Sequence, residues 1–255
     1  MESSSSKTGY LFFTRHGERA DDKKVKEFSR IKFSGDPPLS KRGYGALKEH
    51  GEKINTYITE TLGYEGKITA VTSHFIRTIQ TANSICHCLA NPIGYNDAEG
   101  TEHEGVILVN PSICLGHSSG NFKSNPFGKF LYDKEKPEDL IKDYCEEDSK
   151  FGYVDDESRT VDRPKYPESK TKSRYREAFL DIATQQFLND PSFKAGDTKV
   201  VMMFSHSDCY GTFCKLFDEE YKASSPCYGA TAVIKYTIDS EENELVAESL
   251  DHVIV

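Results

Sequence analysis

The segment Leu11–Arg19 reads LFFTRHGER and passes directly from an apolar run into two arginines that flank one histidine. Residues 9 to 14 are apolar or aromatic, long enough for a strand and too short for a helix, and they lack the polar alternation of an edge strand. We therefore predict a strand buried in the middle of a sheet. Packing alone gives no reason for a basic cluster at the end of such a strand.

The composition is that of an ordinary soluble globular protein of 255 residues. A net charge of -9 argues against general nucleic-acid binding, because a phosphate backbone attracts a basic surface. The seven cysteines lack the spacing of a disulfide framework, the first seven residues are polar, and no run approaches the roughly twenty apolar residues of a membrane span. We expect a cytoplasmic protein that does not contact the membrane.

The remaining pattern alternates strands with helices. Ser40 can cap a helix whose apolar stripe runs to Gly63, and Ile76 begins a second helix that ends near Asn91. Further strands are predicted at 67–72, 106–109, 198–204, 230–238 and 245–250, and a further helix at 175–182. This alternation predicts an α/β fold with a mostly parallel sheet and helices on both faces.

Regularity fails between Gly116 and about Lys170, where four prolines and many charges interrupt any period. The region nevertheless contains eight Phe and Tyr residues, more than a solvating linker would carry. We predict a single domain over residues 9–255, with a flexible tail at 1–8 and an insertion at about 116–170 that packs over the main domain and roofs a site.

Three polar clusters follow predicted strands: Arg15-His16-Gly17, Ser73 to Arg77, and Ser205-His206. In sheets of this kind, ligands bind beyond the carboxyl ends of the strands. The sequence therefore predicts one site that the three clusters share.

These side chains suit phosphoryl transfer. A neutral imidazole such as that of His16 is a competent nucleophile toward phosphorus, and a covalent intermediate replaces one difficult step by two easier ones. Arginine forks such as those of Arg15 and Arg77 bind the equatorial oxygens bidentately. Gly17 lets the backbone approach an anion, and His206 can donate to a phosphoryl oxygen.

In order and spacing, the three blocks resemble the histidine phosphatase superfamily, also called phosphoglycerate mutase-like, over residues 9 to about 217. The resemblance implies a three-layer α/β/α sandwich. It also implies that His16 is the phosphorylated nucleophile, and that Arg15, Arg77 and His206 complete the phosphate pocket.

Within the superfamily, Arg15–Arg19 followed by Asp36–Ser40 and Gly43 is most similar to branch 1 phosphatases of the TULA, or suppressor of T-cell receptor signalling, type. In those proteins the arginine that matches Arg19 also binds phosphate. True mutases usually carry Ser at that position, so the resemblance favours a phosphatase. The accessory ubiquitin-binding and SH3 parts of TULA proteins have no counterpart here.

One expected group is missing. The superfamily usually supplies a Glu or Asp general acid after the third strand, but residues 109–116 contain no carboxylate. Acid phosphatases of the other branch place an Asp directly after the second histidine, whereas Ser207 stands there in this chain. Glu104 and Asp208 remain the candidates.

Other interpretations stay open for single residues. Arg19 can form an exposed ion pair with Asp21 or Asp22, and His206 can be a packed core residue. Cys86-His87-Cys88 is better explained by buried cysteines than by a metal site, because residues two apart on a helix face different directions.

The sequence thus predicts a phosphomonoesterase that needs neither metal nor cofactor and that acts on a phosphorylated small molecule or phosphoprotein. The alternative is a catalytically weak relative that binds phosphate-bearing ligands or serves in assembly. A homodimer is compatible with either.

Overall fold

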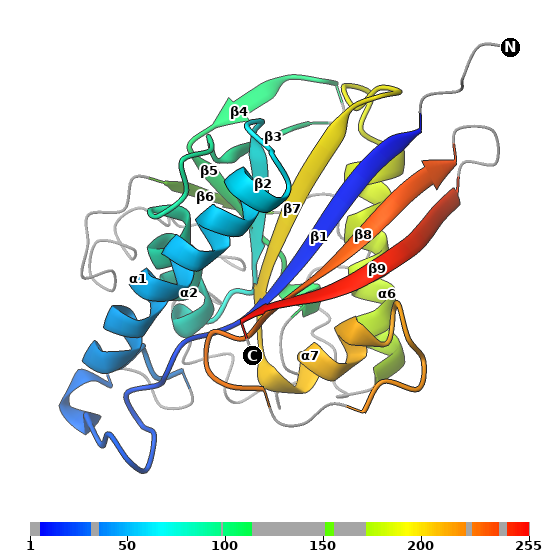
Figure 1. Cartoon of the computed structure of the whole chain (residues 1–255). Helices are drawn as coiled ribbons and strands as arrows, with labels where there is room; N and C mark the ends of the chain where they lie inside the picture. The colour runs from blue at the N-terminus through cyan, green and yellow to red at the C-terminus, as the bar shows by residue number, and fades with distance from the viewer. Residues whose placement is uncertain are drawn as a thin grey trace, which may run out of the picture.

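The computed structural model describes residues 6–31, 36–97, 99–113, 151–155, 172–222, 226–239 and 244–254. A seven-stranded sheet with the order β6-β5-β2-β7-β1-β8-β9 forms its centre (Figure 1). The strands are β1 (Lys7–Arg15), β2 (Ile68–Thr72), β5 (Val106–Val109), β6 (Gly152–Asp155), β7 (Thr198–Ser205), β8 (Thr231–Asp239) and β9 (Glu244–Ile254). The five strands from β6 to β1 pair in parallel, while β8 is antiparallel to both β1 and β9.

Helices cover both faces of this sheet (Figure 1). One face carries α1 (Lys41–Thr56), which continues into a π-helical turn at Tyr57–Thr61, and α2 (Ile76–Cys86). The other carries α6 (Lys172–Ala183), with a π-helical turn at Thr184–Leu188, and α7 (Ser207–Cys214). The predicted α/β class and the three-layer α/β/α sandwich are confirmed.

Alternation along β1 divides the core between the two layers. Phe12 packs in the cluster under α1 and α2, whereas Leu11 and Phe13 pack in the cluster under α6 and α7. All three side chains are fully buried, as expected for a strand with neighbours on both sides and a helical layer on each face. The prediction of a central buried strand is therefore confirmed.

The structure adds elements that the sequence pattern did not predict. A small hairpin joins β3 (Gly94–Asn96) to β4 (Glu102–Glu104), and short 3₁₀ turns lie at Phe28–Arg30 and Pro111–Ile113. Ser40 caps α1 as predicted, its Oγ accepting from the Gly43 amide at 2.9 Å. The second helix ends at Cys86, earlier than predicted.

The region predicted to be an insertion contributes one strand to the main sheet. β6 lies at the edge and pairs in parallel with β5, from Val106 with Gly152 to Val109 with Asp155. Residues 114–150 and 156–171, where the remainder of the predicted roof would fall, lie outside the described residues, as do residues 1–5 of the predicted tail. None of the helices within the described ranges is long and apolar enough to cross a bilayer.

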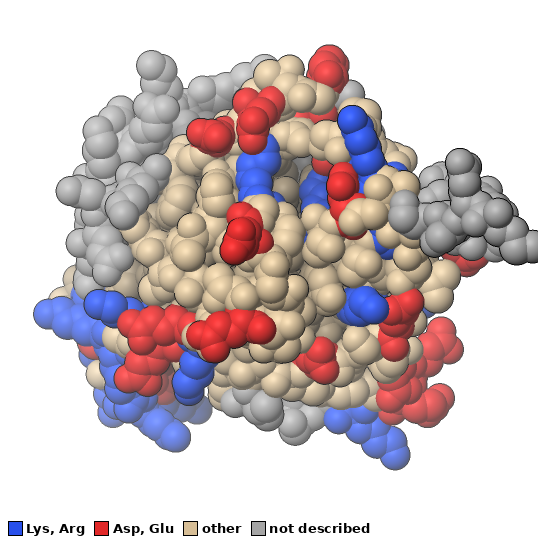
Figure 2. Space-filling view, turned by 45° about the horizontal axis from the view of Figure 1, so that its top comes forward, with Lys and Arg blue, Asp and Glu red and all other residues tan. Residues whose placement is uncertain are grey.

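The sheet end at which the parallel strands begin is hollowed over about 220 Å³. Lys199 reaches into this hollow and contacts Asp190 at 2.5 Å, and Lys67 contacts Glu102 at 2.5 Å. Figure 2, which turns the top of Figure 1 forward, shows acidic and basic side chains interspersed on this face. Both ammonium groups have carboxylate partners. We therefore interpret the hollow as a structural feature that is held together by ion pairs, and not as a binding site.

We predict that Phe13→Ala costs about 3 to 5 kcal/mol of unfolding free energy, because it leaves a cavity in a closed aromatic cluster. Phe13 is fully buried, and its ring centre lies 5.6, 5.8 and 5.3 Å from those of Phe179, Tyr210 and Phe213. Urea denaturation followed by circular dichroism measures the loss. Phe28→Ala, at a residue that is 59% exposed, is the control and should change stability by less than about 0.5 kcal/mol.

Candidate active site

The three predicted clusters meet at the carboxyl end of three adjacent strands. Arg15 at the end of β1 is level with Ser205 at the end of β7, and Thr72 at the end of β2 is level with Phe204. Backbone hydrogen bonds continue this alignment, with the His16 amide donating to Ser205 and the Ser73 amide donating to Phe204. His16, Arg77 and His206 are consequently brought into one site.

His16 is only 3% exposed, and its ring is fixed by one hydrogen bond. Its Nδ1 lies 2.8 Å from the Gly17 carbonyl oxygen, which can only accept, so Nδ1 carries the proton and Nε2 presents a lone pair. Burial, followed by the charges of Arg77 and Arg15, holds the pKa of His16 well below 6.5. The ring is therefore a neutral imidazole with a bare Nε2 at neutral pH.

Arg77 enters the site from the first turn of α2 and is 1% exposed. Its Nη1 donates to Asp36 at 3.1 Å, and Asp36 also accepts the Ile76 amide at 3.1 and 3.2 Å. Burial raises the pKa of Asp36 to about 6, although the charge of Arg77 acts to lower it. Above that pH the ionised carboxylate holds the guanidinium in place.

His206 lies between Arg77 and Ser73 and is fully buried. Its Nδ1 is 3.4 Å from Arg77 Nη2, which can only donate, and its Nε2 is 3.0 Å from Ser73 Oγ. The His206 and His16 ring centres are 5.4 Å apart. These partners indicate a proton on Nε2, so donation to a phosphoryl oxygen from Nδ1 requires that nitrogen to gain a proton.

Arg15 is held by the loop that precedes β8. Its Nη1 donates to the Pro226 carbonyl, and its guanidinium carbon lies 4.1 Å from the centre of the Tyr228 ring. Within the described part of the chain, its buried Nε has no hydrogen-bond partner. At least one N–H donor of Arg15 is thus not used by the described residues.

Arg19 and Gly17 have more local contacts. Arg19 donates from Nε to Asp21 at 2.7 Å and pairs with the same carboxylate through Nη2, which is the ion pair left open by the sequence. The Gly17 amide donates to Thr81 Oγ1 at 3.0 Å, and a Cβ at Gly17 would lie 2.8 Å from Leu47. In the structure, the backbone at Gly17 therefore closely approaches the Leu47 side chain of α1.

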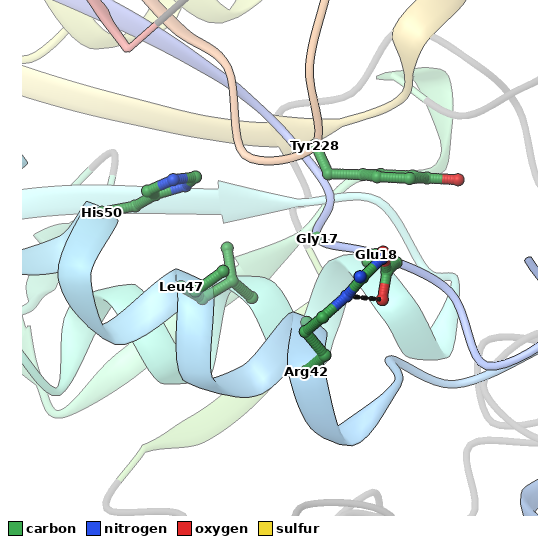
Figure 3. A pocket seen from close by; sticks show the side chains of 8 residues that line it. Gly17, Glu18, Arg42, Leu47, His50 and Tyr228 are labelled. Carbon is green, nitrogen blue, oxygen red and sulfur yellow. Dashed lines mark hydrogen bonds and ion pairs between the residues drawn. The ribbon is translucent and has the colours of Figure 1, made fainter. Parts of the chain in front are cut away.

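A small hollow lies beside this segment, between α1 and the loop before β8. It measures about 100 Å³ and has Gly17, Leu47 and Tyr228 among its lining residues. Figure 3 shows the Tyr228 ring lying above Glu18 and Arg42, which are joined by an ion pair. This ion pair fixes the chain that leaves the site toward α1.

The two candidate acids lie at different ends of the sheet. Glu104 pairs with Gly94 in the β3–β4 hairpin, next to the bridge between Ile93 and Ile68, the first residue of β2. It therefore lies at the opposite end from His16, about 15 Å away along the strand direction, and cannot reach a group on His16.

Asp208 lies in the first turn of α7, two residues after His206. It accepts from the Tyr175 hydroxyl at 3.3 Å. Burial lowers the pKa of Arg15, and the charge of Asp208 acts in the opposite direction, which places this carboxylate in the electrostatic surroundings of the site. Asp208 is therefore the remaining candidate acid.

The structure of Cys86-His87-Cys88 agrees with a packing role. Cys86 is 3% exposed, and Cys88 Sγ donates to the Ser84 carbonyl at 3.3 Å. Over the described ranges, no three His, Cys, Asp or Glu side chains lie close enough together to hold a metal ion.

Searches against protein-family models and curated proteins gave no match. Among solved structures, the fold is similar to that of mycobacterial hydrolase 1 (13% identity, 95% of this chain and 97% of that chain covered, TM-score 0.49). It is also similar to that of a mycobacterial glucosyl-3-phosphoglycerate phosphatase complexed with VO3 (12% identity, 95% of this chain and 97% of that chain covered, TM-score 0.47). A third similar fold is that of phosphoglycerate mutase from Bacillus anthracis str. Sterne (14% identity, 96% of this chain and 94% of that chain covered, TM-score 0.47). The chemistry of the site rests on its own side chains.

We predict that His16 remains neutral, with its proton on Nδ1, when the pH falls from 7.5 to 6.0. Its pKa is held well below 6.5, so the unfolded chain binds a proton at this residue at a higher pH than the folded chain does. Protonation of His16 in the unfolded chain therefore lowers the free energy of unfolding as the pH falls below 6.5. Nitrogen-15 NMR of the ring, assigned with a His16→Gln variant, measures tautomer and titration. A midpoint at or above 6.5 would contradict the prediction.

Proposed function

We propose that this protein is a phosphomonoesterase that works through a covalent phosphohistidine on His16. The observation that carries the proposal is the bare Nε2 of a buried, neutral imidazole among the guanidinium groups of Arg77 and Arg15. A nucleophile for phosphorus and positive charge for the equatorial oxygens are the two things that phosphoryl transfer requires.

The chemistry proceeds in two displacements. Nε2 of His16 attacks phosphorus, the bond from phosphorus to the ester oxygen breaks, and the leaving oxygen takes the electron pair and a proton. Water then attacks the phosphohistidine and gives one proton to the carboxylate that protonated the leaving oxygen, the bond from phosphorus to nitrogen returns its pair to Nε2, and phosphate departs. Arg77 and Arg15 stabilise the transferred group in both steps, because their charge is already in place before reaction.

Two features bear on how the site works. Asp36 holds Arg77 as an acceptor, so the guanidinium is oriented before any ligand binds. Arg19 would have to leave Asp21 to contact phosphate as in the TULA-type branch. We therefore assign the phosphate group first to Arg15, Arg77 and His16, with Arg19 at the rim.

The alternative is a phosphate-binding or assembly subunit with weak turnover. It is favoured by the absence of a carboxylate at residues 109–116 and by the protein partners of both His206 nitrogens. Turnover separates the two proposals, since both bind phosphate-bearing ligands.

We predict that the wild-type protein hydrolyses p-nitrophenyl phosphate and forms a phosphoenzyme on His16 that is stable to base and labile to acid. Rapid quenching with a phosphorus-32-labelled ester, followed by peptide mapping, measures the label. His16→Ala should lose both the label and at least about 1,000-fold of kcat, because the covalent route is removed.

His103→Ala, which changes a half-exposed histidine on the distant hairpin, is the matched control and should keep the label. Vanadate binding without turnover of several phosphomonoesters would favour the alternative. Full activity in His16→Ala would refute the mechanism.

We further predict that Asp208 supplies the leaving-group proton. Asp208→Asn should lower kcat/KM for an alkyl phosphate about 100-fold and for p-nitrophenyl phosphate less than about threefold, because a good leaving group departs without protonation. Steady-state kinetics with the two esters measure the difference. Equal losses on both esters would show that Asp208 does not act as the acid, and Asp218→Asn, at an exposed residue beyond α7, provides the comparison.

A further inference from the structure

We propose that Tyr228 is a positioning residue that aims the Arg15 guanidinium at the phosphoryl group. This inference rests on the proposed function, since Tyr228 acts through Arg15, and Arg15 binds the phosphoryl group at the same site. Tyr228 lies outside the three clusters that carry the chemistry, more than twenty residues after His206.

The Arg15 guanidinium stacks over the face of the Tyr228 ring. The Arg15 guanidinium carbon lies 4.1 Å from the centre of the Tyr228 ring, within the range of a favourable cation–π interaction. The same ring centre lies 5.9 Å from that of His16. Tyr228 therefore borders the nucleophile and covers one face of the guanidinium, which leaves the edges of the arginine fork available for hydrogen bonding.

The ring is itself held in place. The Tyr228 hydroxyl donates to Asp22 at 2.9 Å, which ties it to the segment after Arg19. Its own backbone is tied to β1, because the Gly229 amide donates to the His16 carbonyl at 3.3 Å and the Arg15 amide donates to the Ala230 carbonyl at 2.9 Å.

Gly229 fixes the path of this loop. It has a φ of +78°, and a Cβ at this position would lie 2.2 Å from Nδ1 of His50 on α1. A residue with a side chain would be strained and would displace the loop from the helix. The position of Tyr228 is thus set by contacts with both β1 and α1 (Figure 3).

Arg77 has the same arrangement. Its guanidinium carbon lies 4.4 Å from the centre of the Phe75 ring, while Asp36 accepts from its Nη1. Arg15 and Arg77 therefore each have an aromatic ring on one face and an oxygen acceptor at one nitrogen. Phe75 also packs against His206, with ring centres 5.1 Å apart, so Tyr228 offers the cleaner test.

The test compares Tyr228→Leu with Tyr228→Phe. Tyr228→Leu should weaken vanadate binding about tenfold and lower kcat/KM for p-nitrophenyl phosphate about tenfold, because the guanidinium loses its support. Tyr228→Phe keeps the ring and loses only the bond to Asp22, so both quantities should stay within about threefold of wild type. Calorimetry with vanadate and steady-state kinetics measure them.

A double-mutant cycle shows whether Tyr228 acts through Arg15. In an Arg15→Ala background, Tyr228→Leu should change vanadate affinity less than twofold, because no guanidinium is left to position. Phe28→Leu, the same kind of replacement at an exposed aromatic on the β1–α1 connection, is the control, and thermal melting verifies that each variant is folded.

Three results would overturn the inference: wild-type vanadate affinity in Tyr228→Leu, an equal loss in Tyr228→Phe, or an undiminished loss in the Arg15→Ala background. If the first result came with a loss on the ester, it would place the ring against the leaving group. Failure of the proposed function is distinguishable, since wild-type protein would then not hydrolyse the ester, whereas vanadate affinities of the variants still test the contact between Tyr228 and Arg15 if the wild-type protein binds vanadate.

Discussion

Parallel pairing of β1, β7 and β2 is the constraint on which the site depends. Because Arg15 is level with Ser205 and Thr72 with Phe204, the three strands end at the same height, and the next residue of each is His16, His206 or Ser73. This alignment places the ring centres of the two histidines 5.4 Å apart. A slip of one residue in either pairing would turn one of these side chains to the opposite face of the sheet.

In the proposed reaction, the basic groups that suit phosphate binding also keep His16 available as a nucleophile. A buried imidazole is neutral because burial disfavours the cation, and the charges of Arg77 and Arg15 add to that effect. The Gly17 carbonyl then decides which nitrogen carries the proton. Under the proposed function, phosphate affinity and the protonation state of His16 are therefore coupled, because removing the charge of Arg77 or Arg15 also brings the pKa of His16 closer to that of a free histidine.

Local pattern accounted for the central strands, the first two helices and the clusters at the strand ends, since apolar periodicity and capping act over a few residues. It did not reveal the roles of Asp36 and Tyr228, because these residues are distant in sequence from the arginines that they contact. Asp36 precedes Arg77 by forty-one residues and Tyr228 follows Arg15 by more than two hundred, so only the folded structure brings them together. Asp36 entered the sequence analysis only as the first residue of the Asp36–Ser40 match to the TULA-type branch, with no role for its carboxylate. β6 was missed because its four residues lie between irregular stretches, and α7 because eight residues give little more than two turns.

The position of β1 in the sheet has a consequence for synthesis of the chain. This strand comes first in sequence, yet both of its neighbours, β7 and β8, come from the last third. On the ribosome, the run of Leu11, Phe12 and Phe13 therefore waits for its partners while more than 180 residues are added, roughly 10 to 40 s at ordinary elongation rates. The strand that leads into His16 is thus the one that stays longest without both of its neighbours during synthesis.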